Sequence, residues 1–355
     1  MSHERKERMT RREFFAAGAG IAGGAAIAAG ALTGAARAFP RTQAGTSSRG
    51  SVQTAVAAAK SRVVLVKTDS RADGVKKCFD LLKLDPFDGK SVLVKPNFNT
   101  SDETPGSTHN DTLKAILERA REMGAKRLLI GDRSGPEPTA QVFEKKGIPA
   151  LAAPYEAKLL NFDELGSSGY IKMNPPASHW KEGFLVAAPI VETDAVISTC
   201  CLKTHQFGGV FTMSLKNSVG IVPRAGHNYM RQLHGSPDQR RMIAEINTAY
   251  KPAAIILDGL VAFVDKGPMT GPRKDAGVFL AGTDRVAVDA VGVAILKQLG
   301  SNDDIMKTPI FAQEQIAWAA MIELGAASPA DIVIETPDAA SEAYAETIRK
   351  ILAAG

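Results

Sequence analysis

Short apolar runs alternate with helix-length amphipathic segments along most of the chain. Residues 62–68, 91–97 and 126–132 are continuous aliphatic or β-branched runs of strand length. Residues 73–84 and 112–124 lie between them and carry apolar residues at helical spacing. Parallel strands that are buried on both faces have this continuous apolar character. The pattern therefore predicts an α/β fold with a mainly parallel, helix-covered sheet.

The second half of the chain repeats this alternation after an interruption. Residues 194–200, 253–259 and 277–283 are predicted strands, and residues 331–353 add a last strand and helix. Residues 149–190 are rich in proline and aromatic side chains and follow neither period. We predict that this segment is an insertion or a lid against the sheet.

The first 38 residues resemble a twin-arginine export signal. The segment MTRREFFAAGAG places Arg11 and Arg12 before a weakly apolar Ala/Gly stretch, and a small-x-small cleavage pattern ends at Ala38. We expect the twin-arginine translocase as a partner and a periplasmic or other extracytoplasmic location. An uncleaved membrane anchor and a basic amphipathic helix are the alternatives, and an uncleaved signal is the one membrane contact expected.

Removal of that segment changes the charge balance. Residues 1–38 hold six of the 43 basic and three of the 38 acidic residues, which leaves 37 against 35 and a net charge of +2 instead of +5. A chain with so small an excess of positive charge is not expected to bind nucleic acid. Residues 39–60 are rich in Ser, Thr, Ala and Gly and are a predicted linker, so the predicted globular domain spans residues 61–355.

The cysteines exclude several cofactors. Cys78, Cys200 and Cys201 form no C-x-x-C spacing. A structural zinc site, a four-iron cluster and a disulfide framework are therefore not expected. Cys200 and Cys201 invite a metal site with His205, but adjacent strand residues face opposite sides of a sheet, which favours buried structural thiols.

Polar residues gather where the predicted strands end. Ligands bind beyond the carboxyl ends of the strands in open α/β sheets, so these residues are expected to share one crevice. Helix capping by Asp132 or Asp284 and a solvent-directed Lys95 are the alternative interpretations. The strand-end residues are Lys95, Asn97, Asp132, Lys203, His205, Asp258 and Asp284.

The stretch STCCLKTHQFGGVFTMSLKN, residues 198–217, concentrates chemistry next to one predicted strand. Lys203 and Lys216 suit an anion clamp, and His205 is a candidate general acid or base. Two solvated lysines are the alternative. The predicted substrate-binding residues are Lys95, Asn97, Lys216 and Asn217, and the predicted catalytic residues are His205, His109 and Lys203.

A divalent metal is one candidate cofactor, and the cofactor is otherwise unknown. His109 precedes a predicted helix that Asn110 or Asp111 is expected to cap, and Asp289 interrupts an apolar helix, where we expect a site lysine to pair with it. Carboxylates and histidines at one edge would suit Zn, Mn, Fe or Ni. The predicted metal ligands, or alternatively orienting groups, are Asp132, Asp258 and Asp289.

Several separated motifs resemble the family called domain of unknown function 362. They are VLVKPNFN, STHNDTLKAILERAREMGAKRLLIGDRSG, LKTH, MSLKNSVGIVP, ILDGL and GTDRVAVDAVG, in order over residues 62 to 300. The resemblance implies no established activity. Some members carry a ferredoxin-like module with two four-iron clusters, which this sequence cannot hold.

These features favour an exported enzyme that acts on a small anionic metabolite by acid/base or metal-assisted chemistry. A non-catalytic protein that binds an oxyanion or a metal is an alternative, because the same lysines and asparagines would serve it. An accessory factor for redox-enzyme assembly is a third interpretation.

Overall fold

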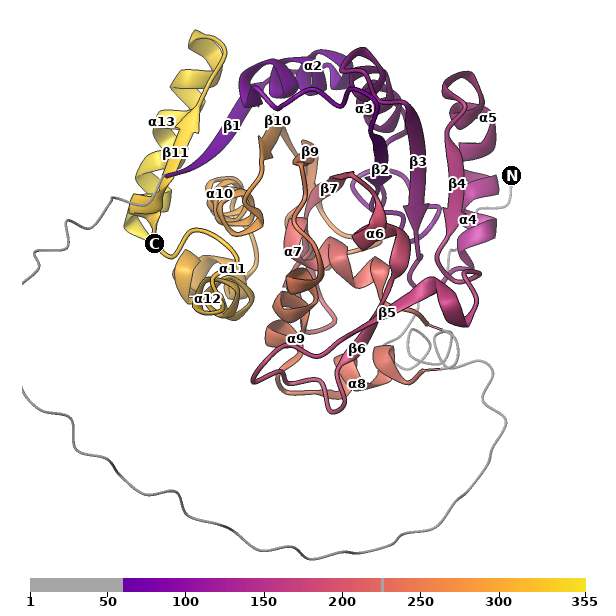
Figure 1. Cartoon of the computed structure of the whole chain (residues 1–355). Helices are drawn as coiled ribbons and strands as arrows, with labels where there is room; N and C mark the ends of the chain where they lie inside the picture. Colours follow the sequence, from indigo (N-terminus) through magenta and orange to yellow (C-terminus); the bar gives the residue numbers. More distant parts are fainter. Residues whose placement is uncertain (1–59, 225–226) are drawn as a thin grey trace, which may run out of the picture.

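The computed structural model describes residues 60–224 and 227–355. Within these residues the main sheet has nine strands, in the order β11-β1-β10-β9-β7-β2-β3-β4 with β8 paired to β7, and β5 and β6 form a separate hairpin (Figure 1). The strands are β1 (Ser61–Lys67), β2 (Ser91–Lys95), β3 (Arg127–Asp132), β4 (Lys158–Asn161), β5 (Tyr170–Met173), β6 (Phe184–Ala187), β7 (Ala195–His205), β8 (Val210–Phe211), β9 (Ala254–Phe263), β10 (Arg273–Gly282) and β11 (Ile332–Glu335). The α-helices are α2 (Arg71–Leu82), α3 (Asn110–Glu122), α4 (Thr139–Lys145), α5 (Ile148–Ala152), α6 (Ala188–Glu192), α7 (Ser214–Asn217), α8 (Tyr229–Gly235), α9 (Gln239–Ile246), α10 (Arg285–Leu299), α11 (Asp303–Lys307), α12 (Glu314–Met321) and α13 (Ala339–Ala354). Short 3-10 turns, among them η3 (Ser218–Ile221), complete the chain.

Parallel pairing dominates the sheet, which confirms the predicted fold class. Strand β2 pairs in parallel with β3 and β7, and β7 pairs in parallel with β9. Strand β10 runs antiparallel to both of its neighbours, β1 and β9. Its end therefore points to the opposite edge of the sheet, so the expectation that Asp284 joins the other strand ends is wrong. Asp284 instead caps α10, accepting the backbone N–H groups of Val286 and Ala287.

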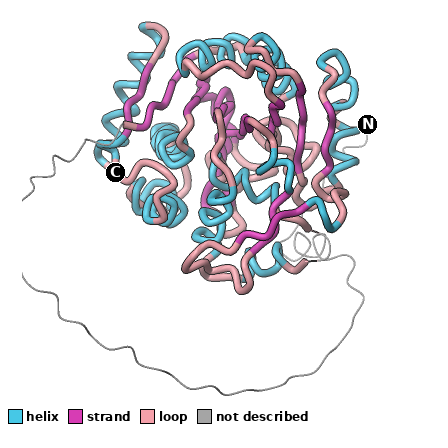
Figure 2. The backbone as a smooth tube through the Cα atoms, in the orientation of Figure 1, coloured by secondary structure: helices cyan, strands magenta, loops and turns pink. Residues whose placement is uncertain are grey.

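Helices cover both faces of the sheet, and side chains fill the space between the layers. Helices α2 and α3 cover one face, whereas α10 and α12 lie on the other (Figures 1 and 2). The α3 helix shows why: Leu113, Ile116, Leu117 and Ala120 form one stripe and are fully buried against the sheet. Burying each of the larger of these side chains stabilises the fold by about 1.5–3 kcal/mol.

Two parts of the chain differ from the predicted elements. Strand β7 continues to His205, five residues beyond its predicted end, because it pairs there with β8 in a hairpin. In residues 149–190, β4 pairs with β3 at the edge of the main sheet, and the β5–β6 hairpin packs into an apolar cluster around Trp180.

The predicted signal, residues 1–38, and most of the predicted linker lie outside the described residues. Among the residues that are described, none of the helices has both the length and the apolar character that crossing a membrane requires.

Candidate functional site

A small cavity lies where β2, β3 and β7 end and where α7 and η3 cover them. Its volume is about 50 Å³. Residues far apart in the sequence meet here because the carboxyl ends of neighbouring parallel strands lie at one edge. We call this the site cavity. The predicted residues that line it are Lys95, Asn97, Asp132, His205, Lys216 and Asn217.

The β7–β8 hairpin returns the chain over the cavity. His205 pairs with Val210 across a turn of residues 206–209, in which Gly208 has a φ of 83° that favours glycine. Val210 has a φ of 63°, a left-handed conformation that costs a β-branched residue about 1–3 kcal/mol. A Cβ atom on Gly209 would lie 2.8 Å from His205 Nδ1 and 2.8 Å from Lys216 Cε. Glycine at this position therefore lets the two functional side chains lie close together.

Asp289 fixes the start of α7, the short helix that carries Lys216. Its carboxylate accepts the backbone N–H groups of Ser214 at 2.7 Å and Leu215 at 3.0 Å. The predicted partner was a site lysine, and this expectation is corrected: the partners are the free N–H groups that begin α7. Burial raises the pKa of Asp289 to about 7. The carboxylate thus positions Lys216 without lining the cavity.

Lys95 and Asp132 form a fully buried ion pair with an Nζ–Oδ1 distance of 2.6 Å. The Lys95 ammonium also donates to the Pro96 carbonyl at 2.7 Å and to Asn217 Oδ1 at 3.3 Å, which engages its three protons. Asp132 accepts the backbone N–H of Phe98 at 2.8 Å on its other oxygen. Burial raises the pKa of Asp132, and the Lys95 charge opposes that rise.

Asn217 connects these groups to the neighbouring strand. Its amide nitrogen donates to Ser198 Oγ at 3.0 Å and to the Thr199 carbonyl at 3.2 Å. Lys95, Asp132 and Asn217 therefore satisfy one another, and they form a rigid polar floor for the cavity.

Lys216 differs from Lys95 because its ammonium has no partner among the residues that the structure describes. It lies at the cavity with 9% of its surface exposed, and its side chain forms no hydrogen bond or ion pair with any residue that the structure describes. Burial, reinforced by the positive charges of Lys203 and Arg133, lowers the pKa of Lys216 to about 7. A buried cation without a counter-ion is costly, so this position favours an anion.

His205 is a neutral hydrogen-bond donor. Burial and the neighbouring Lys216 hold its pKa well below the usual 6.5. Its Nδ1 accepts the Gly209 N–H at 3.3 Å, so the proton of the neutral ring is on Nε2. That N–H forms no hydrogen bond with the described residues.

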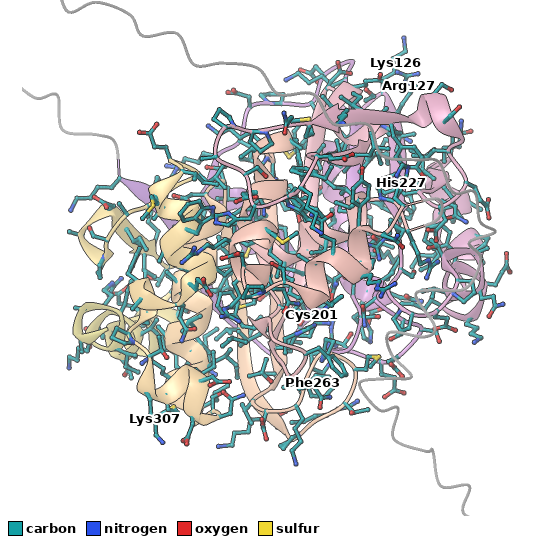
Figure 3. The ribbon with its side chains drawn as sticks, turned by 90° about the horizontal axis from the view of Figure 1, so that it is seen from below. Lys126, Arg127, Cys201, His227, Phe263 and Lys307 are labelled. Carbon is teal, nitrogen blue, oxygen red and sulfur yellow. The ribbon has the colours of Figure 1, made fainter. Side chains whose placement is uncertain are left out.

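The structure places two of the predicted catalytic residues away from the cavity. Lys203 is fully buried on β7, near the labelled Cys201 and Phe263 of Figure 3, and its Nζ donates to the Gly106 carbonyl at 2.6 Å. Burial lowers its pKa to about 8. His109 itself caps α3, so the expectation that Asn110 or Asp111 does so is corrected. Its Nδ1 accepts the N–H of Asp111, and burial lowers its pKa.

The three carboxylates predicted as metal ligands do not form one ligand set. Asp258 pairs with Arg71 at 2.9 Å and accepts the Thr112 hydroxyl at 2.7 Å. Asp132 pairs with Lys95, and Asp289 binds backbone N–H groups, as described above. No group of three His, Cys, Asp or Glu side chains that could hold a metal ion occurs in residues 60–224 and 227–355. This corrects the expected ligand set, because each carboxylate already has its own donors.

Sequence reasoning missed seven residues that line the cavity: Asn99, Arg133, Gly135, Thr212, Val219, Gly220 and Pro268. The Arg133 guanidinium donates to the carbonyls of Val219 at 2.6 Å and Val222 at 2.9 Å, which fixes η3 over the cavity. Its signal was available, because Arg133 directly follows the strand-end Asp132.

Gly220 allows η3 to approach the ion pair closely. A Cβ atom there would lie 2.6 Å from Asp132 Oδ1 and 2.8 Å from Lys95 Nζ. Asn99, Thr212 and Gly220 carried no sequence signal, because their role depends on contacts between distant segments.

A family model for a domain of unknown function (DUF362) matches residues 92–294, which are more than half of the chain and include every residue that lines the site cavity. The protein belongs to this family. A thylakoid-associated protein of Synechocystis sp. is 26% identical over 255 residues, which are 70% of this chain and 75% of that protein.

The lactate racemase apoprotein from Thermoanaerobacterium thermosaccharolyticum is a distant structural neighbour. It aligns with a TM-score of 0.41 and 14% sequence identity over 80% of this chain and 85% of that chain.

Proposed function

We propose that the protein binds a small anionic metabolite in the site cavity and transfers a proton to or from it. The observation that carries this proposal is the buried Lys216 ammonium, which has no counter-ion among the described residues. The anion would supply the missing partner and form charge-assisted hydrogen bonds.

The charge and size of the cavity define the ligand. The Lys95–Asp132 pair is neutral as a unit, so Arg133 and protonated Lys216 leave the lining positive. A volume of 50 Å³ accommodates about three to five water-sized groups. A short carboxylate or another small oxyanion matches both properties, whereas a nucleotide is far too large.

Lys216 and His205 supply the proton chemistry. A lysine with a pKa of about 7 exchanges its proton readily at neutral pH, which suits a general acid or base. The neutral His205 ring donates from Nε2 and would stabilise negative charge as it develops on a ligand oxygen. Lys216 is thus the anion's counter-ion and proton donor, and His205 is the second donor to the same anion.

Calorimetric titration with acetate tests the binding. We expect Lys216→Met to weaken acetate binding by about 10- to 100-fold, because a hydrogen bond to a charged group contributes about 1.5–3 kcal/mol. Lys114→Met is the matched control: this lysine is exposed and lies outside the cavity, so the affinity should not change. Equal acetate affinity in wild type and Lys216→Met would refute the assignment.

A non-catalytic anion-binding protein is the second candidate function. It is favoured by the environment of His205, whose Nδ1 accepts a backbone N–H instead of pairing with the carboxylate that commonly orients a catalytic histidine. Proton NMR of short carboxylates in D2O with wild type and Lys216→Met distinguishes the two candidates. Lysine-dependent loss of a carbon-bound proton supports catalysis, and binding without exchange supports the second candidate.

We also propose that the protein acts outside the cytoplasm. The support is the twin-arginine pattern around Arg11 and Arg12 and the thylakoid association in the name of the Synechocystis relative. Export in a folded state suits a protein whose site is assembled from distant segments.

A further inference from the structure

Three buried polar atoms on residues that line the site cavity have no hydrogen-bond partner among the described residues. They are Asn97 Oδ1, Asn99 Nδ2 and Thr212 Oγ1. Asn97 is 8% exposed and Thr212 is 5% exposed, so bulk water at the protein surface does not serve as the hydrogen-bond partner of these side chains. Buried polar groups are almost always satisfied in folded proteins, so three orphan groups at one cavity call for a common explanation.

The orphan groups differ in kind, and the difference describes the missing ligand. Asn97 Oδ1 accepts a hydrogen bond, Asn99 Nδ2 donates one, and the Thr212 hydroxyl can do either. Lys216 and His205 add only donors.

A simple carboxylate cannot satisfy this set. Its oxygens accept from Lys216, His205 and Asn99, but it offers no proton to Asn97 Oδ1. An amino group would offer one, yet its positive charge would lie beside Lys216 and Arg133. A hydroxyl group donates one hydrogen bond and accepts another without adding charge.

We propose that the ligand is a small carboxylate that carries a hydroxyl group. The carboxylate pairs with Lys216 and His205, and the hydroxyl donates to Asn97 Oδ1 and accepts from Asn99 or Thr212. This inference rests on the proposed anion binding and adds the substrate class. Asn97, Asn99 and Thr212 are then the specificity-determining residues of the site.

Calorimetric titration of the full chain with glycolate and propionate tests the inference at about pH 6, where Lys216 is protonated. The two probes have the same number of non-hydrogen atoms, and a methyl group in propionate replaces the hydroxyl of glycolate. We expect glycolate to bind at least about tenfold more tightly, because propionate leaves the polar groups unpaired. Asn97→Leu and the isosteric Thr212→Val should each reduce this preference, and propionate affinity should hold within about threefold.

The outcomes separate this inference from the one it rests on. Equal binding of glycolate and propionate, both weakened by Lys216→Met, overturns the hydroxyl requirement and retains anion binding; water molecules would then satisfy the orphan groups. Binding of neither probe overturns both proposals. A glycolate preference that survives in both Asn97→Leu and Thr212→Val overturns the assignment of these specificity residues. If Asn97→Leu does not fold, Thr212→Val alone decides that last point.

Discussion

Replacement of Lys216 by methionine should stabilise the protein, and the gain should depend on pH. Methionine keeps a similar length and volume in the cavity and removes the ammonium. In the folded protein the pKa of Lys216 is about 7, whereas an exposed lysine has a pKa of 10.5. The folded state therefore binds the proton less tightly than the unfolded state does.

The size of the effect follows from that difference. Each pKa unit corresponds to about 1.36 kcal/mol, so the charged form of Lys216 disfavours the folded state by up to about 5 kcal/mol. This destabilisation is fully present below pH 7, falls as the pH rises from 7 to 10.5, and vanishes when lysine is neutral in both states. The Lys216→Met variant should gain most below pH 7 and almost nothing near pH 10.5.

Urea unfolding, followed by fluorescence of Trp180 and Trp318, measures the difference. Saturating acetate should narrow the gap at low pH, because an anion at about 100 times its dissociation constant stabilises the wild type by about 2.7 kcal/mol. The matched control is Lys114→Met, whose exposed side chain should give no pH-dependent gain. The difference in the free energy of unfolding between wild type and Lys216→Met could stay constant with pH, or the variant could be less stable at low pH. Either result would refute the conclusion that Lys216 is a buried, unpaired charge.

Three further predictions test the surroundings and the export of the site. Gly220→Ala should destabilise the fold by about 1–3 kcal/mol in urea unfolding, because the added Cβ would meet the buried Lys95–Asp132 ion pair. The control is Gly235→Ala, whose added Cβ has open space and should not destabilise the fold. Equal effects of the two substitutions would argue against close packing at η3. Asp289→Ala should lower stability by about 2–5 kcal/mol and weaken acetate binding, because two N–H groups lose their acceptor, and unchanged acetate affinity would exclude a positioning role. Replacing Arg11 and Arg12 by lysine should retain the precursor inside the cell on fractionation, since a receptor recognises the pair; normal export would exclude the twin-arginine route.

Much of the fold was predictable from local patterns. The apolar runs that form β1, β2 and β3 are continuous because both faces of these strands are buried, and the stripe of α3 repeats at helical spacing. The direction of β10 was not predictable, because neither an apolar run nor its flanking residues specify which way a strand runs. The far end of β7 was also missed, since its pairing with β8 depends on the return of the chain.

The candidate site shows even more clearly which features local sequence predicts and which depend on the tertiary structure. The sequence by itself determined that Lys95, Asp132, His205 and Lys216 lie at strand ends or next to a glycine turn, and parallel strands then bring such residues to one edge. The sequence could not show which of these side chains are paired within the protein and which are left to bind a ligand. A strand end tolerates a polar residue in either case.

Only the tertiary structure decided which charges are paired. Lys95 and Lys203 find a carboxylate and carbonyls from distant segments, whereas Lys216 is buried without a partner in the described residues. A charge loses its water through burial by the whole fold, and its compensation depends on atoms that are remote along the chain. Local sequence therefore indicates where polar chemistry gathers, and long-range packing determines which group is left to bind a ligand.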